Sequence, residues 1–341
     1  MYIDCIKKIV QRKDLTESET ASLMEELLSG ALADTQIAAF IAALATKGET
    51  SGELGSAAST MRKTAIRIQA DSPIVVDTVG TGGDMAGTFN ISTTTAFVVA
   101  GCGVAVAKHG NRSVSSKCGS ADVLEVLGVS LSCPPEIVEE ALNGIGICFL
   151  FAPLFHGAMR HAAKARKEVG IRSLFNMLGP LTNPAGANCQ LIGVYAPSLT
   201  ELFAQALKTL GSRRAMVVHG HDGLDEISVC APTRVSELKG GMIRTYDLFP
   251  DMIFGHLAEP KSLAGGDPEM NAAITRAILS GEAGDARNCV LLNAAAALVC
   301  AEKAADIPEG IRMAEDAIDS GKAMEKLDAL VRFTQAHTPK A

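Results

Sequence analysis

Short apolar runs rich in β-branched residues alternate with helical segments between residues 74 and 220, and this alternation restricts the fold more than any other feature of the chain. The runs are IVVDTVG, VAVAKHG, ICFLFA, NCQLIGVYA and RAMVVHG. Such alternation is typical of a mostly parallel sheet covered by helices, and it predicts an α/β fold. Ligands of open α/β sheets bind beyond the carboxyl ends of the strands. We therefore expect a site among the loops at 80–92, 108–120 and 219–226.

The N-terminal part of the chain predicts helices only. Thr16 and Glu19 form the T-x-x-E pattern of a capping box before ASLMEELLSGALA, whose apolar residues have helical spacing. Two further helical segments, DTQIAAFIAALATKG and SGELGSAASTMRKTAIRI, follow before the character changes at Ser72-Pro73. We expect a small all-helical N-terminal domain over 1–70 and a larger α/β domain with a mostly parallel central sheet over 71–341. The number of domains agrees with the chain length, because about 150 residues per domain suggests two domains.

The composition excludes several classes of protein. The chain has 38 acidic and 31 basic residues, a net charge of −7, and only 4% aromatic residues without any Trp. Nucleic-acid binding uses basic surfaces with exposed rings, so no nucleic-acid partner is expected. The nine cysteines are scattered without a C-x-x-C pair, which favours reduced thiols in the cytoplasm. No signal peptide is visible, and the longest apolar stretches, 97–107 and 290–301, are shorter than the ~20 residues that span a bilayer.

The first loop is rich in glycine and hydroxyl side chains. Its sequence runs GTGGD from Gly80 to Asp84 and continues through Thr88, Asn90, Ser92 and Thr93. Glycines after a strand let backbone N–H groups approach an anion, and the N-terminus of the next helix adds further donors. The loop is therefore either a phosphate cradle or an ordinary tight turn between a strand and a helix. Neither the G-x-G-x-x-G nor the Walker A pattern is present.

The second loop combines cations with hydroxyl groups. KHGNRSVSSK places Lys108, Arg112 and Lys117 around a run of serines. Lysine neutralises phosphate as a point charge and arginine can hold two oxygens, so an oxyanion cradle is favoured over a solvated basic surface. Ser120 is an N-cap, a phosphate donor or both. His109 has no required acid–base role.

The third loop and one helix supply further polar groups. Asp225 and Glu226 are adjacent in a glycine-containing turn, which suits either Mg²⁺ held by oxygen ligands or an acidic turn without a metal. The segment LFHGAMRHAAKARKEVG predicts one long helix with a polar face. Its cations form a mainly solvated helical face, from which one could reach a carboxylate substrate: Arg160, Lys164, Arg166 and Lys167. No covalent nucleophile motif is present, so the loops suit transfer chemistry in which the charge of a leaving group is stabilised.

At these loops the chain resembles the anthranilate phosphoribosyltransferase family. The matching strings, spread over about half of the chain, are DTVGTGGD, TFNIST, KHGNRSVSSKCGSADVLE, FNMLGPLTNPA and GLDEIS. The resemblance implies a nucleoside phosphorylase/phosphoribosyltransferase-like fold, with the site in a cleft between the two domains and a homodimer formed through the helical domains. The segment near 172–186 would return to the helical domain. The implied reaction joins anthranilate to phosphoribosyl pyrophosphate (PRPP), giving phosphoribosyl anthranilate and pyrophosphate.

The resemblance also implies a role for individual residues. Lys108 and Arg112 would stabilise the departing pyrophosphate electrostatically. Two Mg²⁺ ions would be bound, one by Ser92 and Glu226 and the other by Asp225 and Glu226. Anthranilate would contact Gly80, Asn111 and Arg166. The residues expected to hold PRPP are Gly80, Gly83, Asp84, Thr88, Asn90, Ile91, Ser92, Thr93, Lys108, His109, Gly110, Asn111, Arg112, Ser113, Val114, Ser115, Ser116 and Ser120.

One departure and two alternatives accompany this resemblance. Many members of the family have glycine after the loop aspartate, where this chain has Met85-Ala86. A pyrimidine nucleoside phosphorylase shares the fold and runs related ribosyl chemistry, but the string from Lys108 to Ser120 resembles the transferase. A non-catalytic nucleic-acid-binding relative is disfavoured by the net charge of −7 and by the Asp225-Glu226 pair.

Overall fold

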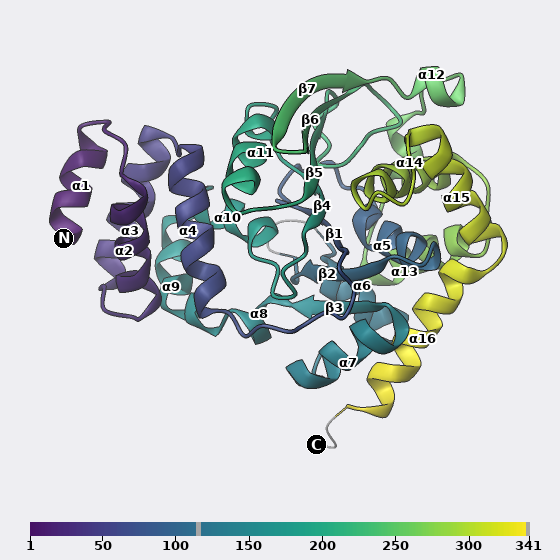
Figure 1. Cartoon of the computed structure of the whole chain (residues 1–341), viewed down its shortest axis with the longest axis horizontal. Helices are drawn as coiled ribbons and strands as arrows, with labels where there is room; N and C mark the ends of the chain where they lie inside the picture. The colour runs from purple at the N-terminus through teal and green to yellow at the C-terminus, as the bar shows by residue number, and fades with distance from the viewer. Residues whose placement is uncertain (114–116, 339–341) are drawn as a thin grey trace.

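The computed structural model describes residues 1–113 and 117–338, and the expectations for Val114, Ser115 and Ser116 lie outside these residues. Figure 1 shows a group of helices at the N-terminal end beside a larger part built around one sheet. The expected combination of a small helical domain and a larger α/β domain is confirmed. Within the described ranges, no helix is long and apolar enough to cross a membrane.

The N-terminal helices begin and end where local signals place them. They are α1 (Tyr2–Val10), α2 (Glu17–Leu28), α3 (Asp34–Lys47) and α4 (Ser51–Thr64). The predicted capping box is present, because the Thr16 hydroxyl accepts from the Glu19 N–H and the Glu19 carboxylate accepts from the Thr16 N–H. Helix α3 ends at Gly48, whose φ of 88° few other residues adopt.

In the part of the chain that the structure describes, the sheet has seven strands in the order β3-β2-β1-β4-β5-β6-β7. The first five strands along the chain are parallel, and β6 and β7 extend the sheet as an antiparallel hairpin. The strands are β1 (Val75–Gly80), β2 (Ala105–Gly110), β3 (Ile147–Phe151), β4 (Cys189–Gly193), β5 (Arg214–Gly220), β6 (Thr233–Lys239) and β7 (Met242–Leu248). The mostly parallel sheet is confirmed, whereas the hairpin was not expected.

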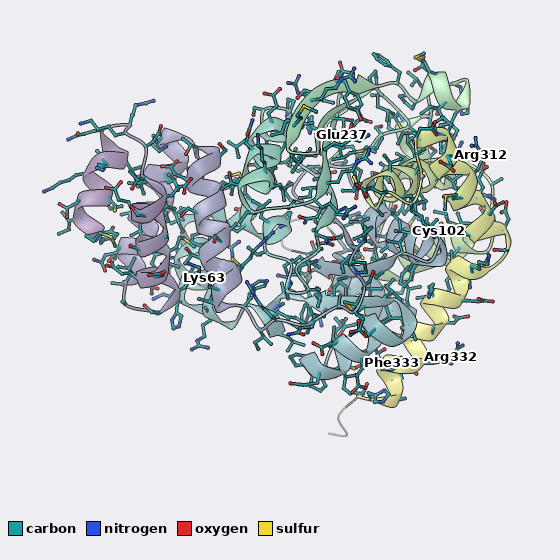
Figure 2. The ribbon with its side chains drawn as sticks, viewed as in Figure 1. Lys63, Cys102, Glu237, Arg312, Arg332 and Phe333 are labelled. Carbon is teal, nitrogen blue, oxygen red and sulfur yellow. The ribbon has the colours of Figure 1, made fainter. Side chains whose placement is uncertain are left out.

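The hairpin has a local signal that sequence reasoning did not use. Its two-residue turn is Gly240-Gly241, with φ values of 56° and 75°, and glycine pairs of this kind favour type I′ turns. Glu237 on β6, labelled in Figure 2, forms an ion pair with Arg214 on β5 at 2.9 Å. The pair lies within the antiparallel register that joins the hairpin to the rest of the sheet.

Helices cover both faces of the sheet. On β4, Leu191 packs against one core and Ile192 against another, as the alternation of side chains along a strand requires. The first core lies under α5 and α14, and the second lies under α11 and the N-terminal helices. The helices after β1 are α5 (Ile91–Gly101), α6 (Ser120–Leu127), α7 (Pro135–Ile145), α8 (Ala152–Phe155), α9 (Arg160–Val169), α10 (Leu174–Leu178), α11 (Leu199–Thr209), α12 (Asp251–Phe254), α13 (Pro268–Leu279), α14 (Asp285–Cys300), α15 (Ile307–Asp319) and α16 (Lys322–Ala336). Three short 3-10 turns, Gly157–Met159, Gly179–Leu181 and Pro260–Leu263, complete the elements.

The single long helix expected over residues 154–170 is wrong. The chain forms α8 and then α9, because His156 between them has a non-helical φ of −116° and ψ of 52°. Helix α9 packs against α3, and α10 packs against α4. Figure 1 shows both helices beside the N-terminal group, although they follow it by about one hundred residues in sequence.

Candidate active site

The first loop is held against the third loop by a backbone hydrogen bond. The N–H of Gly82 donates to Asp225 Oδ2 at 2.8 Å. A Cβ at Gly80 would lie 2.6 Å from that same oxygen, and one at Gly193 on β4 would lie 1.4 Å from the Asp225 carbonyl oxygen. Both positions therefore need glycine so that the backbone and side chain of Asp225 can lie against the ends of β1 and β4. Gly193 is a site residue that sequence reasoning missed.

The N-terminus of α5 also contacts the third loop. The N–H of Ser92 donates to Glu226 Oε1 at 3.1 Å, and the Thr78 hydroxyl donates to the Ser92 carbonyl at 2.9 Å. The side chains of Ile91 and Thr93 are buried, at 2% and 1% exposure, so they face the core and not the loop surface. The expected donors at the start of α5 are thus brought to the acidic pair across the sheet edge.

Lys108 lies beneath the first loop instead of on an open surface. Its side chain is 4% exposed, and its ammonium donates to the Thr78 carbonyl at 2.6 Å and to Ser92 Oγ at 3.4 Å. Burial lowers the pKa of Lys108, while Asp77 and Glu226 oppose that effect. The pKa of the buried Asp77 carboxyl is raised to about 6 by burial, although Lys108 and the Asn183 amide partly offset this. A lysine therefore underlies the edge of the sheet, and Asp77 and Glu226 favour its charged form against the effect of burial.

The carboxyl groups of Asp84, Asp225 and Glu226 lie close together where the first and third loops meet. Burial raises the pKa of Glu226 to about 7, and burial together with Asp84 and Glu226 raises the pKa of Asp225 well above its usual value. Carboxylates that repel one another in this way favour a bound cation, and their hard oxygens suit Mg²⁺. Within the described ranges, no group of three or more His, Cys, Asp or Glu side chains is arranged to hold a metal ion. Oxygen donors of this kind are those with which Mg²⁺ is held together with substrate phosphates.

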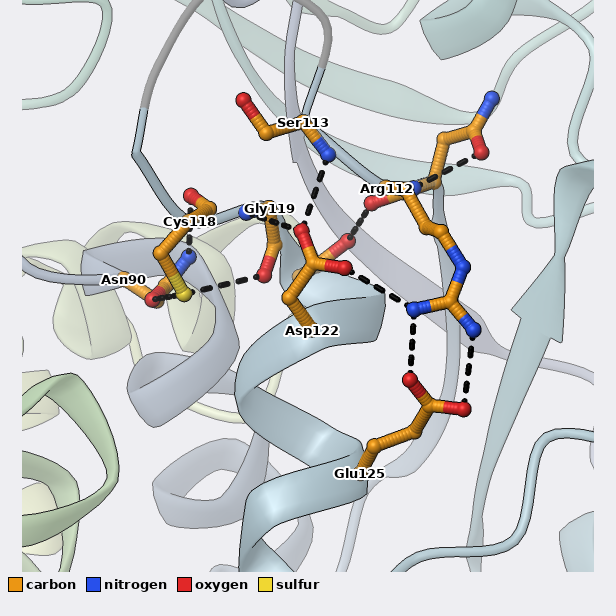
Figure 3. Close-up of polar contacts among 9 residues, drawn as sticks. Asn90, Arg112, Ser113, Cys118, Gly119, Asp122 and Glu125 are labelled. Atoms are coloured by element: carbon orange, nitrogen blue, oxygen red, sulfur yellow. Dashed lines mark hydrogen bonds and ion pairs between the residues drawn. The ribbon is translucent and has the colours of Figure 1, made fainter. Parts of the chain in front are cut away.

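The guanidinium of Arg112 in the second loop is bound by two carboxylates of helix α6. It donates to Asp122 at 3.0 Å and to the two oxygens of Glu125 at 2.5 and 2.9 Å. Figure 3 shows these three contacts. Within residues 1–113 and 117–338, these bonds use three of its five N–H donors. Its side chain is 49% exposed. Sequence reasoning could not foresee these partners, which compete with phosphate for the same charge.

The second loop is ordered around the start of α6. The expected N-cap role of Ser120 is wrong, because Gly119 is the N-cap and Ser120 is the first helical residue. The Ser120 hydroxyl donates to the Asn111 carbonyl at 3.2 Å. Asp122 Oδ2 accepts from the N–H groups of Gly119 and Ser113, as Figure 3 shows. A Cβ at Gly110 would lie 2.1 Å from Ser120 Oγ, so the loop can approach α6 only with glycine there.

His109 is buried beside a second histidine. Its Nδ1 lies 3.0 Å from the Gly179 carbonyl, and its ring centre is 5.1 Å from that of His156. Burial lowers the pKa of His109 to about 3 and that of His156 to about 4, so both rings are neutral at pH 7. His109 therefore contributes a neutral ring and no positive charge to the second loop.

Arg166 and Arg172, two arginines of the α9–α10 region, have different contacts. Arg166 is half-buried over the ring of Phe175 at 5.3 Å, and within the described ranges it forms no ion pair. Burial lowers the pKa of its guanidinium. Arg172, which sequence reasoning missed, donates to the Gly83 carbonyl and lies 4.4 Å from the ring of Tyr195. The α9–α10 region thus reaches the first loop from the side of the N-terminal helices.

The segment Ala264-Gly265, which sequence reasoning missed, also contacts the first loop. Thr88 forms an isolated bridge with Ala264, and the Gly265 N–H donates to the Gly87 carbonyl at 2.9 Å. A Cβ at Gly265 would lie 2.6 Å from the backbone of Thr88. Met85, the departure noted in this loop, has a φ of 61°, a conformation that glycine adopts more easily.

The fold and these loops define a glycosyl transferase with a helical bundle. The model of the glycosyl transferase family helical bundle domain matches residues 3–65, and that of the family's a/b domain matches residues 72–324. These two matches cover the helices and the sheet described above.

Relatives of the whole chain narrow the class. An anthranilate phosphoribosyltransferase of Syntrophobacter fumaroxidans is 68% identical over 98% of this chain and 99% of its own length. A crystal structure of that enzyme from Thermus thermophilus is 42% identical, has a TM-score of 0.92, and covers 97% of this chain and 99% of the other. The Saccharomyces cerevisiae enzyme in complex with PRPP and Mg is 28% identical with a TM-score of 0.88, and 98% of each chain is covered. The chain belongs to the anthranilate phosphoribosyltransferase family, which confirms the resemblance and the class of enzyme.

Proposed function

We propose that this protein transfers the phosphoribosyl group of PRPP to the amine of anthranilate in tryptophan biosynthesis, in the cytoplasm, releasing pyrophosphate. The observation that carries the proposal is the convergence of loops from different strands. Gly82 and Ser92 of the first loop donate backbone hydrogen bonds to Asp225 and Glu226 of the third, and Lys108 lies beneath both. Relatives bound to PRPP with Mg and to 4-fluoroanthranilate support this assignment.

The diphosphate and ribose of PRPP would lie on the first and second loops. Backbone donors from Gly83 to Thr93 and the segment from Lys108 to Ser120 would hold them, with Val114, Ser115 and Ser116 assigned by the resemblance alone. Asp84 is placed beside Asp225. Arg112 would bind a phosphate oxygen with its remaining donors while α6 holds its guanidinium in place.

Two Mg²⁺ ions per chain would bind with the substrate, one at Ser92 and Glu226 and the other at Asp225 and Glu226. When bound, Mg²⁺ neutralises charge on the diphosphate and makes it a better leaving group. The chain contributes the carboxyl groups of Asp225 and Glu226, whose pKa values burial raises, so a bound cation would favour their ionised form.

The residues of the chain would favour displacement at the anomeric carbon. Preorganised donors and the buried charge of Lys108 stabilise the negative charge that develops on the leaving group. An aryl amine keeps its lone pair at neutral pH, so no strong base is required. Holding the amine against the opposite face of the ribose can lower the barrier by up to ~7–11 kcal/mol in the best cases. No residue needs to act as a covalent nucleophile.

Anthranilate would bind between the loops and α9. The guanidinium of Arg166 lacks an acidic partner within the described ranges, so it would pair with the carboxylate of anthranilate. Gly80 and Asn111 would contact the ring and the amine. The hydrogen bond from Arg172 to the Gly83 carbonyl supports a position of the return segment near 172–186 between the two substrates.

A homodimer through the helical domain is supported by α1. Ile3 and Val10 stand seven residues apart on this helix and are 63% and 69% exposed, next to the half-buried Ile6. Spacing of this kind places them on one face, which a second copy of the chain would cover.

The test is a direct assay of the transfer. Purified protein mixed with anthranilate, PRPP and Mg²⁺ should consume the fluorescence of anthranilate, and a chelator should stop the reaction. Release of pyrophosphate in equal amounts is the second readout. Phosphorolysis of thymidine or uridine without anthranilate transfer would contradict the proposal and favour the phosphorylase instead.

A further inference from the structure

A buried asparagine of α13 contacts the polar side chain that begins α5. Asn271 is 1% exposed, and its Nδ2 donates to Asn90 Oδ1 at 2.9 Å. One turn further along both helices, Thr275 and Thr94 share a hydrogen bond of 2.9 Å between their hydroxyls. Helix α13 therefore meets α5 through two polar contacts, one at each turn.

The direction of the Asn271 contact is determined by a backbone group. The N–H of Gly266 donates to Asn271 Oδ1 at 2.8 Å. An N–H group cannot accept, so the oxygen of Asn271 must face Gly266 and its NH₂ group must face Asn90. Asn90 can then meet Asn271 only with its own oxygen.

The second loop requires the same orientation of Asn90. Asn90 Nδ2 donates to the carbonyl of Cys118 at 3.4 Å. The Cys118 thiol lies within hydrogen-bond distance of Asn90 Oδ1, at 3.3 Å, and of the Gly119 carbonyl, at 3.5 Å. Figure 3 draws these contacts. A carbonyl cannot donate, so the NH₂ group of Asn90 must face the second loop. Burial raises the pKa of Cys118 to about 11, which keeps its thiol protonated and able to donate.

These contacts decide what Asn90 can offer a ligand. Its oxygen accepts a hydrogen bond from Asn271 and also lies 3.3 Å from the Cys118 thiol, whose single proton can go to this oxygen or to the Gly119 carbonyl at 3.5 Å. Its NH₂ group donates once within the described ranges and retains one N–H. A donor is the group that an anionic phosphate or a ribose oxygen can use, whereas the opposite orientation would present a carbonyl oxygen to that anion.

We propose that Asn271 is a positioning residue that fixes the side-chain amide of Asn90 with its NH₂ end toward the bound sugar phosphate. The inference rests on the proposed function, because it takes the first loop as the PRPP site. Asn271 does not touch the substrate itself, and it acts through the orientation of Asn90. It thereby links the C-terminal helices to the loop that holds the transferred group.

Three variants test the proposal. Asn271→Asp keeps an acceptor for Gly266 but places an acceptor opposite Asn90 Oδ1, so the Asn90 amide is expected to turn over. Asn271→Ala removes the side-chain amide that contacts Asn90 and adds no charge. It replaces the aspartate variant as the test if that variant does not fold. Thr275→Val is the matched control, because it breaks the neighbouring contact between α13 and α5 without reaching the side chain of Asn90.

The readouts are the KM for each substrate, kcat, the Kd of PRPP with Mg²⁺ by calorimetry, and Tm, all at pH 8.5 to ionise the introduced carboxylate. We expect Asn271→Asp to raise the KM and Kd for PRPP by about tenfold, as for the loss of one hydrogen bond to a charged group, with the KM for anthranilate changed by less than about twofold. Asn271→Ala should raise the KM for PRPP by a smaller factor in the same direction. Thr275→Val should lower Tm while the KM for PRPP stays as in the wild type.

Two results would overturn the proposal. One is PRPP affinity of wild-type strength in both Asn271 variants, and the other is an equal rise in KM for Thr275→Val, which would reduce the role of Asn271 to packing. Failure of the proposed function is distinguishable from these results, because the wild-type chain itself would then bind no PRPP in the same calorimeter.

Discussion

Replacing Glu226 by glutamine should stabilise the metal-free protein while it removes activity. Burial raises the pKa of Glu226 to about 7, compared with 4.5 for an exposed glutamate. The folded chain therefore holds a proton that the unfolded chain releases above pH 4.5, so the stability of the wild type falls between pH 4.5 and pH 7. At about 1.4 kcal/mol per pH unit, the loss above pH 8 is roughly 3 kcal/mol.

Glutamine avoids this loss because it cannot ionise. It keeps an oxygen that accepts from the Ser92 N–H, and Asp77 remains to face Lys108. In chelator at pH 8.5, Glu226→Gln should exceed the wild type in free energy of unfolding by roughly 3 kcal/mol, and at pH 5 by about 1 kcal/mol or less. Adding Mg²⁺ and PRPP should stabilise the wild type much more than the variant.

Urea unfolding followed by circular dichroism at both pH values measures these differences. Glu201→Gln is the control, because its exposed ion pair with Arg234 should contribute no more than about 1 kcal/mol at either pH. A metal-free Glu226→Gln protein that is less stable than the wild type at pH 8.5 would refute the reasoning. So would a stability difference that does not change with pH.

Three further predictions concern Gly80 in the first loop and the arginines of the α9–α10 region. Gly80→Ala should reduce kcat/KM by about tenfold or more, because a Cβ would lie 2.6 Å from Asp225 Oδ2; a variant with wild-type kcat/KM in the fluorescence assay would contradict this. Arg166→Ala should raise the KM for anthranilate by about tenfold with little change for PRPP; Lys164→Ala on the same helix, which pairs with Asp34, is the control. Arg172→Gln should raise the KM for PRPP a few-fold by releasing Gly83; an effect on anthranilate alone would reassign the residue.

Much of the fold could be predicted because its signals are local. The capping box at Thr16, the glycines that end helices and the β-branched runs each act over a few residues. The hairpin of β6 and β7 was within reach of the same reasoning, since Gly240-Gly241 is a turn signal. The broken helix at His156 was not, because the apolar and polar spacing continues through the break while the backbone does not.

The candidate site was predictable in its chemistry and less so in its contacts. Glycines, cations and adjacent carboxylates after strands indicate an anion and a hard cation wherever the strands end. The ion pairs of Arg112 with α6 and the burial of Lys108 depend on packing between elements, and no residue type or spacing reports them. The same holds for Arg172 and Asn271, which lie about 90 and 180 residues from their partners in the first loop.

The chain's own residues determine the kind of each element and the chemical character of each loop, since helix caps, turns and side-chain charge depend on neighbours a few positions away. Tertiary structure alone decides which loops meet. The backbone of Asp225 fits against β1 and β4 only because glycines stand at 80 and 193, and that fit requires the parallel register of both strands. Contacts of this kind form between residues far apart in sequence, where many pairings share the same local pattern and only the packed core selects one.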